Sequence, residues 1–187
     1  SGKTSVSKML EKLGVHIIDT DVIAHEIVEP NSDCLNELVD YFGDSILNDD
    51  KTLNRKKLAS IAFSDKQKTE ALSNITHKYI KAEVVKDINT TDAELVGIDG
   101  AVIIGSNVEP LCEFIVSVIA DKQSRITRIK TRDNITDEQA IQRINAQNDD
   151  EFYKENSMYI IYNNGDIAQL ESDVVGLFNK IKGNSFE

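Results

Sequence analysis

The chain has 187 residues, of which 40% are hydrophobic and 28% are charged, and its formal net charge is −11 at pH 7. This composition is ordinary for a globular protein, and the length predicts one domain with a substantial core. The acidic excess argues against a nucleic-acid partner, which would need a basic face. Because no apolar run approaches the length of a membrane span, we expect neither a transmembrane segment nor a signal peptide.

The cysteines and histidines do not have the spacing of a metal site. Cys34 and Cys112 lie in apolar surroundings without a C-x-x-C pattern, so we expect reduced packing residues in a cytoplasmic protein. His16, His25 and His77 share no ligand spacing, which argues against a metal site built from protein side chains alone.

The first four residues, Ser1-Gly2-Lys3-Thr4, match the second half of a phosphate-binding loop, G-x-x-x-x-G-K-[ST]. The pattern places its first glycine five residues before Gly2, after a strand. In such a loop the lysine reaches the terminal phosphates, the threonine hydroxyl binds Mg²⁺, and backbone N–H groups at a helix start hold the anion. The alternative is a chance match on an exposed chain end, since the tripeptide Gly-Lys-Thr is common.

Apolar spacing predicts a helix over 4–13 and then a short buried strand over 15–19 that ends in an Asp-Thr-Asp motif. In open α/β sheets, ligands bind beyond the carboxyl ends of strands, so Asp21 could accept a proton from a hydroxyl that attacks the γ-phosphate. The alternative is that both aspartates cap a helix that starts near Val22. Both can hold, with Asp19 structural and Asp21 chemical.

The rest of the chain continues to alternate between helices and strands. Helices are predicted over 33–43, most of 55–90, 122–132, 137–147 and 166–182, and strands over 95–99, 114–120 and 159–162. Capping boxes are predicted for the pairs Ser64–Gln67 and Thr136–Gln139. The alternation indicates an open parallel α/β sheet covered by helices on both faces, with the strand before Ser1 at its centre.

Asp99 closes the strand over 95–99, at a position where an acidic residue often binds Mg²⁺ directly or through water. A carboxylate at the end of a strand is common, so this position alone favours a metal role only slightly. The turn Asn163-Asn164-Gly165 follows the last strand, and from its residues a tight turn is the preferred interpretation.

Four of the five arginines, Arg125, Arg128, Arg132 and Arg143, fall within nineteen residues. The first three are spaced i, i+3, i+7 and therefore share one helix face. Because the planar guanidinium binds phosphate oxygens in pairs, the cluster favours a helical lid that closes over a triphosphate and excludes water. The alternative is a solvated helix face.

Together these residues resemble the dephospho-CoA kinase family over nearly the whole chain. The resemblance is carried by S-G-K-T-S-V at 1–6, L-G-V-H-I-I-D-T-D-V-I-A-H at 13–25, Y-F-G-D-S-I-L at 41–47, I-T-H at 75–77, R-I-T-R-I-K-T-R-D-N-I-T-D-E-Q-A-I-Q-R-I-N-A-Q at 125–147, and Y-I-I-Y-N-N-G at 159–165. It implies a P-loop nucleotide kinase fold in a single domain. The implied core covers about 1–30, 91–121 and 149–187, with a helical acceptor-binding insertion at about 31–90 and a lid at about 122–148.

The resemblance also implies a reaction, the transfer of the γ-phosphate of ATP to the ribose 3′-hydroxyl of dephospho-CoA, with Mg²⁺ as cofactor, ATP and dephospho-CoA as small-molecule partners, and neither nucleic acid nor membrane as a partner. Asp21 is then the general base, assisted by Lys3 and Arg128, and acceptor binding involves Asp21, His25 and His77. Mg²⁺ is held by Thr4 and Asp99. ATP is bound by Ser1, Gly2, Lys3, Thr4, Ser5, Arg128, Arg132, Arg143 and Asn164, the last on the adenine side.

Three departures from the family pattern concern the acceptor side. His25 stands where the family usually has arginine, Lys78 replaces a common proline, and Gly105 stands where a carboxylate is frequent. Two alternatives therefore stay open. One is a P-loop kinase that acts on a nucleoside monophosphate or another small acceptor, and the other is a nucleotide-binding protein without catalysis.

Overall fold

The computed structural model describes residues 1–184, which fall into two compact units. Unit 1 comprises Ser1–Ile17, Ala93–Gly97 and the described residues from Cys112 onward, and unit 2 comprises Ile18–Asp92 and Ile98–Leu111. The chain passes from one unit to the other within strands β1 (His16–Asp19) and β2 (Val96–Asp99), which pair with each other. Helices and strands alternate as predicted, so the mixed α/β class is confirmed.

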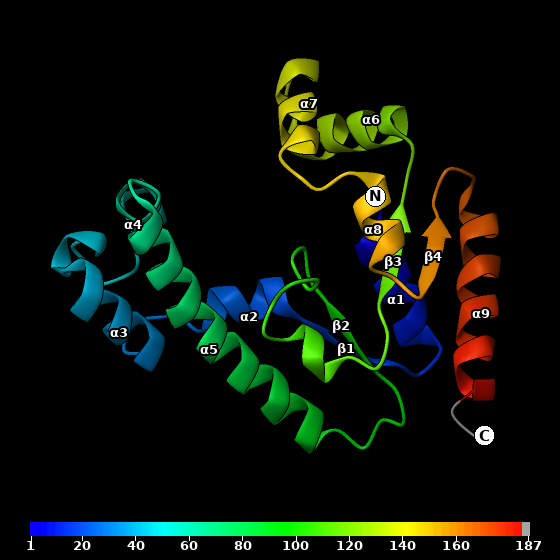
Figure 1. Ribbon diagram of the computed structural model, residues 1–187, viewed down its shortest axis with the longest axis horizontal. Helices are drawn as coiled ribbons and strands as arrows, with labels where there is room; N and C mark the ends of the chain where they lie inside the picture. Colours follow the sequence, from blue (N-terminus) through cyan, green and yellow to red (C-terminus); the bar gives the residue numbers. More distant parts are fainter. Residues whose placement is uncertain (185–187) are drawn as a thin grey trace. The chain divides into compact units, whose positions relative to one another are not determined.

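Unit 1 is built on a parallel strand pair with a helix at its side. Strands β3 (Val116–Ile119) and β4 (Tyr159–Tyr162) pair in parallel, and α9 (Ile167–Asn184) runs beside β4 (Figure 1). Helix α1 (Lys3–Lys12) packs on α9. The shared core buries one residue of α1, one of β4 and four of α9, namely Val6, Ile161, Leu170, Val174, Leu177 and Ile181. Burying each such side chain stabilises the fold by about 1.5–3 kcal/mol.

Helices α6 (Lys122–Asp133) and α7 (Asp137–Asn145) of unit 1 form a hairpin with its own small apolar cluster of Ile126, Ala140 and Ile144. The capping box predicted at the start of α7 is confirmed, because the Thr136 side chain accepts from the Gln139 N–H and the Gln139 side chain accepts from the Thr136 N–H. The short helix α8 (Asp150–Glu155) was not predicted.

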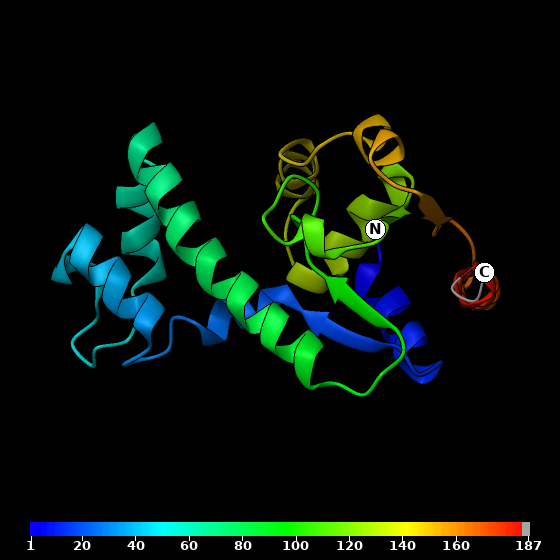
Figure 2. The same ribbon diagram turned by 60° about the horizontal axis from the view of Figure 1, so that its bottom comes forward.

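Unit 2 is mainly helical. Its elements are α2 (Thr20–Glu26), α3 (Asp33–Phe42), the 3₁₀ turn η1 (Asp44–Ile46), α4 (Arg55–Ala62), α5 (Lys66–Thr90) and the 3₁₀ turn η2 (Glu109–Leu111). Helices α3 and α4 lie against the long helix α5 in both Figure 1 and Figure 2. Leu38 of α3, Ile46 of η1 and Val84 of α5 are fully buried.

Element boundaries follow the local sequence with a few corrections. The strand predicted over 114–120 covers only Val116–Ile119, and the helix predicted near Val22 begins at Thr20. The capping box predicted at Ser64 is wrong. The Ser64 hydroxyl donates to the Ile61 carbonyl at the end of α4, and Asp65 caps α5 by accepting from the N–H of Lys68. Serine and aspartate are equally good caps, so the sequence did not separate the neighbouring positions.

Within residues 1–184 the four strands form two two-stranded sheets, β1 with β2 and β3 with β4. One parallel sheet through all four strands, covered on both faces, stays a prediction. Across the same residues, every helix is too short or too polar to cross a bilayer.

Candidate active site

Helix α1 begins at Gly2, which acts as its N-cap in a left-handed conformation with φ 102° and ψ 25°. The Gly2 carbonyl accepts from the N–H groups of Ser5 and Val6, at 3.1 and 3.3 Å. Lys3, Thr4 and Ser5 therefore form the first turn of the helix, as the motif predicts. A helix N-terminus presents N–H groups without intrahelical acceptors and the positive end of the helix dipole, which together favour a bound anion.

The predicted Arg128 lies against this helix start. Its Nη1 donates to the Ser1 carbonyl at 3.3 Å, and its Nη2 donates to the Asn163 carbonyl at 3.0 Å. The Asn163 side chain completes the group, because its Nδ2 donates to the Ser1 carbonyl at 2.9 Å. The structure thus brings the phosphate-loop motif together with one arginine of the cluster.

Asn163 was missed from the sequence, which pointed instead to its neighbour Asn164. The Asn164 side chain has a different contact, since its Oδ1 accepts from the Asp121 N–H at 2.8 Å and joins the loops after β3 and β4. A usable signal for Asn163 was its position directly after the apolar run of β4. A polar residue there is easily buried and then needs hydrogen-bond partners.

Positive charge gathers at the start of α1. Lys3 stands in the first turn of the helix, and the Arg128 guanidinium donates to the Ser1 carbonyl at 3.3 Å. Lys3 and Arg128 both belong to unit 1, so their positive charges lie at the same helix start. Such a field favours a polyanion at the helix start.

The other arginines of the cluster are paired with carboxylates. Arg132 binds Asp133 through Nε and Nη2, at 2.7 and 2.9 Å, and Arg143 donates from Nη1 to the same carboxylate. The Arg132 guanidinium, helped by Arg143, holds the pKa of Asp133 below its ordinary value. Asp133 thereby ties the end of α6 to α7, and phosphate binding by these two arginines stays a prediction.

Arg125 is the most buried of the paired arginines. Its Nη2 lies 3.2 Å from the Asp150 carboxylate, and its side chain is 15% exposed. This pair links α6 to α8, so the arginine has a structural contact within unit 1. The three arginines that were predicted to share one face of this helix thus contact different partners. Arg125 pairs with Asp150, Arg128 donates to the Ser1 carbonyl, and Arg132 pairs with Asp133.

In unit 2 the Asp-Thr-Asp motif stands at the junction of β1 and α2. Asp19 caps α2, because its Oδ1 accepts from the N–H groups of Asp21 and Val22 at 2.9 and 3.1 Å. The structural role expected for Asp19 is confirmed. Asp21 is exposed in the first turn of α2, and its carbonyl lies 2.7 Å from Nδ1 of His25 one turn later.

Asp99 ends β2, and its carbonyl accepts from the Thr20 hydroxyl at 3.0 Å, which joins the loop after β2 to the start of α2. The Gly100 backbone packs closely against Thr20, because a Cβ on Gly100 would lie 2.2 Å from the same hydroxyl. Lys3, Thr4 and Arg128 thus belong to unit 1, while Asp21 and Asp99 belong to unit 2. Their convergence around one triphosphate stays a prediction.

His77 lies on α5, where its carbonyl accepts from Nδ2 of Asn107 at 2.9 Å. The next residue, Lys78, stands where the resembled family commonly has proline. It pairs with Glu37 of α3, which also accepts from the Tyr79 hydroxyl at 2.7 Å. Lys78, and then Tyr79, hold the pKa of Glu37 below its ordinary value. These contacts fasten α5 to α3.

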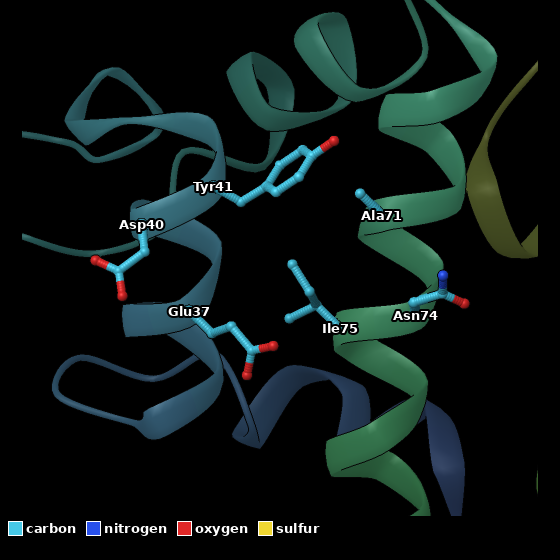
Figure 3. A pocket seen from close by; sticks show the side chains of 6 residues that line it. All are labelled: Glu37, Asp40, Tyr41, Ala71, Asn74 and Ile75. Carbon is cyan, nitrogen blue, oxygen red and sulfur yellow. The ribbon is translucent and has the colours of Figure 1, made fainter.

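A pocket of roughly 370 Å³ lies beside this contact, between α3 and α5 (Figure 3). Glu37 and Ile75 point toward each other across it from the two helices. Its lining is Glu37, Asp40, Tyr41, Ala71, Asn74 and Ile75. With two carboxylates and no cation in this lining, the pocket does not suit a phosphate group, and none of the predicted site residues lines it.

Comparisons with known proteins point to one family over most of the chain. The family model described as dephospho-CoA kinase matches residues 1–169. A dephospho-CoA kinase of Lactobacillus johnsonii is 33% identical over 184 residues, which cover 97% of this chain and 93% of the relative. One of Listeria monocytogenes strain EGD-e is 34% identical over 187 residues, with 98% and 94% covered.

Two solved structures resemble this one. The dephospho-CoA kinase from Campylobacter jejuni has a TM-score of 0.69 at 26% identity, with 98% of this chain and 93% of that chain covered. The structure of TT1252 from Thermus thermophilus has a TM-score of 0.82 with 96% and 91% covered, and at 22% identity it supports the fold alone. From the family match, the full-length relatives and the helix start at Gly2, we conclude that this chain belongs to the dephospho-CoA kinase family.

Proposed function

We propose that this protein transfers the γ-phosphoryl group of ATP to the ribose 3′-hydroxyl of dephospho-CoA and releases CoA and ADP. The observation that carries the proposal is the family match over residues 1–169, together with relatives of that activity at 33–34% identity over nearly their full length. The N-terminal loop supports it, because Gly2 starts a helix and the Arg128 guanidinium lies beside that start.

The architecture that we propose is a P-loop nucleotide kinase fold. The hairpin of α6 and α7 is the lid, at about 122–148, and its separate apolar cluster holds the two helices together. The helices at about 31–90 form the acceptor-binding part, and the remaining segments form the core. We expect the lid to close over ATP, with Arg132 and Arg143 then exchanging Asp133 for phosphate oxygens.

On the ATP side, the first turn of α1 would hold the β- and γ-phosphates. Backbone N–H groups of Gly2, Lys3 and Thr4 provide donors, and the Lys3 ammonium and the Arg128 guanidinium neutralise the charge that spreads over the phosphoryl oxygens. Arg128 already lies beside Ser1, so it needs no large movement to reach this position. The loop at Asn164 would then contact the adenine.

A magnesium ion that accompanies ATP fits the oxygen donors present. The Thr4 hydroxyl lies in the exposed first turn of α1, and the Asp99 carboxylate stands at the end of β2. A hydroxyl and one carboxylate are typical partners for Mg²⁺, which keeps several waters. Thr4 and Asp99 would hold the ion, whose charge would offset that of the phosphate oxygens and help to orient the γ-phosphate.

On the acceptor side, we propose Asp21 as the general base for the ribose hydroxyl. Its neighbour Asp19 caps the helix, so the Asp21 carboxylate is not needed for that role. Asp21 is exposed, which leaves it accessible to a substrate. His25 and His77 would contribute to acceptor binding from α2 and α5.

An assay of ADP release tests the proposal, with ATP alone, with ATP and dephospho-CoA, and with ATP and AMP. We expect dephospho-CoA, and not AMP, to stimulate the release of ADP from ATP. Stimulation by AMP and not by dephospho-CoA would replace the acceptor, and ATP binding without any turnover would identify a nucleotide-binding protein without catalysis. The same assay with Asp21→Asn should show kcat lower by roughly 10²-fold or more with little change in the KM for ATP. Asp49→Asn, at another exposed aspartate of unit 2, serves as its control.

A further inference from the structure

The side chain of Asn163 is buried at the end of β4, although polar side chains are rarely buried. Asn163 is 7% exposed, and among the residues that the structure describes only Ser117 is a comparably buried polar residue. Its main chain is anchored to the neighbouring strand, because its N–H donates to the Ile119 carbonyl at 2.7 Å. Asn163 therefore stands on a fixed element of unit 1.

The amide group of Asn163 joins two segments that lie far apart in the sequence. Its Nδ2 donates to the Ser1 carbonyl at 2.9 Å, and its Oδ1 lies 3.4 Å from Nη2 of Arg128. The chemistry fixes the orientation of the amide, because a carbonyl needs a donor and a guanidinium needs an acceptor. Arg128 also donates to the main-chain carbonyl of Asn163, at 3.0 Å.

The Asn163 side chain packs so closely against Ser1 and Gly2 that the phosphate loop has no room to shift toward β4. A Cβ placed on Gly2 would lie 2.2 Å from Nδ2 of Asn163 and 3.8 Å from Nη1 of Arg128. The loop backbone, the amide and the guanidinium are therefore packed against one another as well as hydrogen-bonded. The contacts to Ser1 and Asn163 use Nη1 and Nη2 of Arg128, so they do not engage its Nε–H.

We propose that Asn163 is a positioning residue that sets the Ser1–Gly2 backbone and the Arg128 guanidinium in one arrangement before ATP binds. Asn163 is neutral, and it acts on the phosphates only through the Ser1–Gly2 backbone and the Arg128 guanidinium. An arginine side chain has many rotamers, and holding it in place in advance removes an ordering cost from the binding of ATP. The inference rests on the proposed function, since it assumes that the phosphates bind at the start of α1.

The test compares Asn163→Asp, Asn163→Ala and the control Asn179→Asp, an exposed asparagine on α9. The aspartate variant keeps the volume of the side chain but puts an acceptor against the Ser1 carbonyl, and it remains readable if the alanine variant does not fold. We expect the KM for ATP to rise by about 10-fold or more in both Asn163 variants. The KM for dephospho-CoA should stay within about threefold, and the control should match the wild type.

A double-mutant cycle with Arg128→Ala separates positioning from a merely structural role. If part of the effect of Asn163 passes through Arg128, the Asn163→Ala change raises the KM for ATP by a smaller factor in the Arg128→Ala variant than in the wild type. Independent, multiplying effects would overturn the inference, and so would an unchanged KM for ATP in Asn163→Asp. A wild-type protein that does not phosphorylate dephospho-CoA would refute the proposed function instead, so the two failures are distinguishable.

Discussion

Replacing Gly2 by alanine should weaken both the fold at the start of α1 and the binding of ATP there. The φ of 102° costs a residue with a Cβ about 1 kcal/mol. The new Cβ would also lie 2.2 Å from Nδ2 of Asn163, so the amide has to move away from the Ser1 carbonyl. Losing that bond and leaving a buried amide without its partner costs about 2 kcal/mol more. The folded protein bears this sum of about 3 kcal/mol, and a loop that relaxes it by moving away must return to its native arrangement when ATP binds, so the KM for ATP should rise by up to about 10²-fold.

Gly14→Ala is the matched control, because Gly14 has φ 93° but no atom within 4 Å of the position of a Cβ. This variant incurs the backbone cost alone, about 1 kcal/mol, which lowers the melting temperature by about 2–4 °C. Its KM for ATP should stay within about twofold of the wild type. The steric argument at Gly2 is refuted if Gly2→Ala binds ATP normally, or if Gly14→Ala weakens ATP binding to the same extent.

Three further predictions concern stability and reactivity. Thr136→Ala removes the cap of α7 and should cost about 1 kcal/mol, seen as a melting temperature lower by about 2–4 °C. Gly176→Ala adds a methyl group in open space within α9 and should stabilise the protein by about 1 kcal/mol, so a lower melting temperature would contradict it. Burial, and then the charge of Glu37, raise the pKa of the Cys34 thiol to about 11. Alkylation of Cys34 at pH 8 should therefore be at least about 10²-fold slower in the native protein than in the urea-unfolded protein, as measured by peptide mapping. Because the unfolded thiol loses its proton first as the pH rises, the free energy of unfolding should fall between about pH 8.5 and pH 11, and urea titrations of Cys34→Ala should show a smaller fall.

Features that depend on a few neighbouring residues could be predicted from the sequence. The helix after Gly2, the cap at Asp19 and the capping box at Thr136 all follow from interactions within about four residues of the chain. The strand over 159–162 follows from its apolar, aromatic run. The cap of α5 was placed one residue early, because Ser64 and Asp65 satisfy the same local rule.

The partners of the polar side chains were decided by the tertiary structure. Arg128 meets Ser1 across 127 residues and Asn163 meets Ser1 across 162 residues, because α1 packs on α9 and β4 ends beside the start of α1. Local rules contain no information on such distant pairs, so the sequence predicted an arginine cluster but not its division among Ser1, Asp133 and Asp150. It also favoured Asn164 over Asn163, since only burial against the phosphate loop distinguishes the two amides.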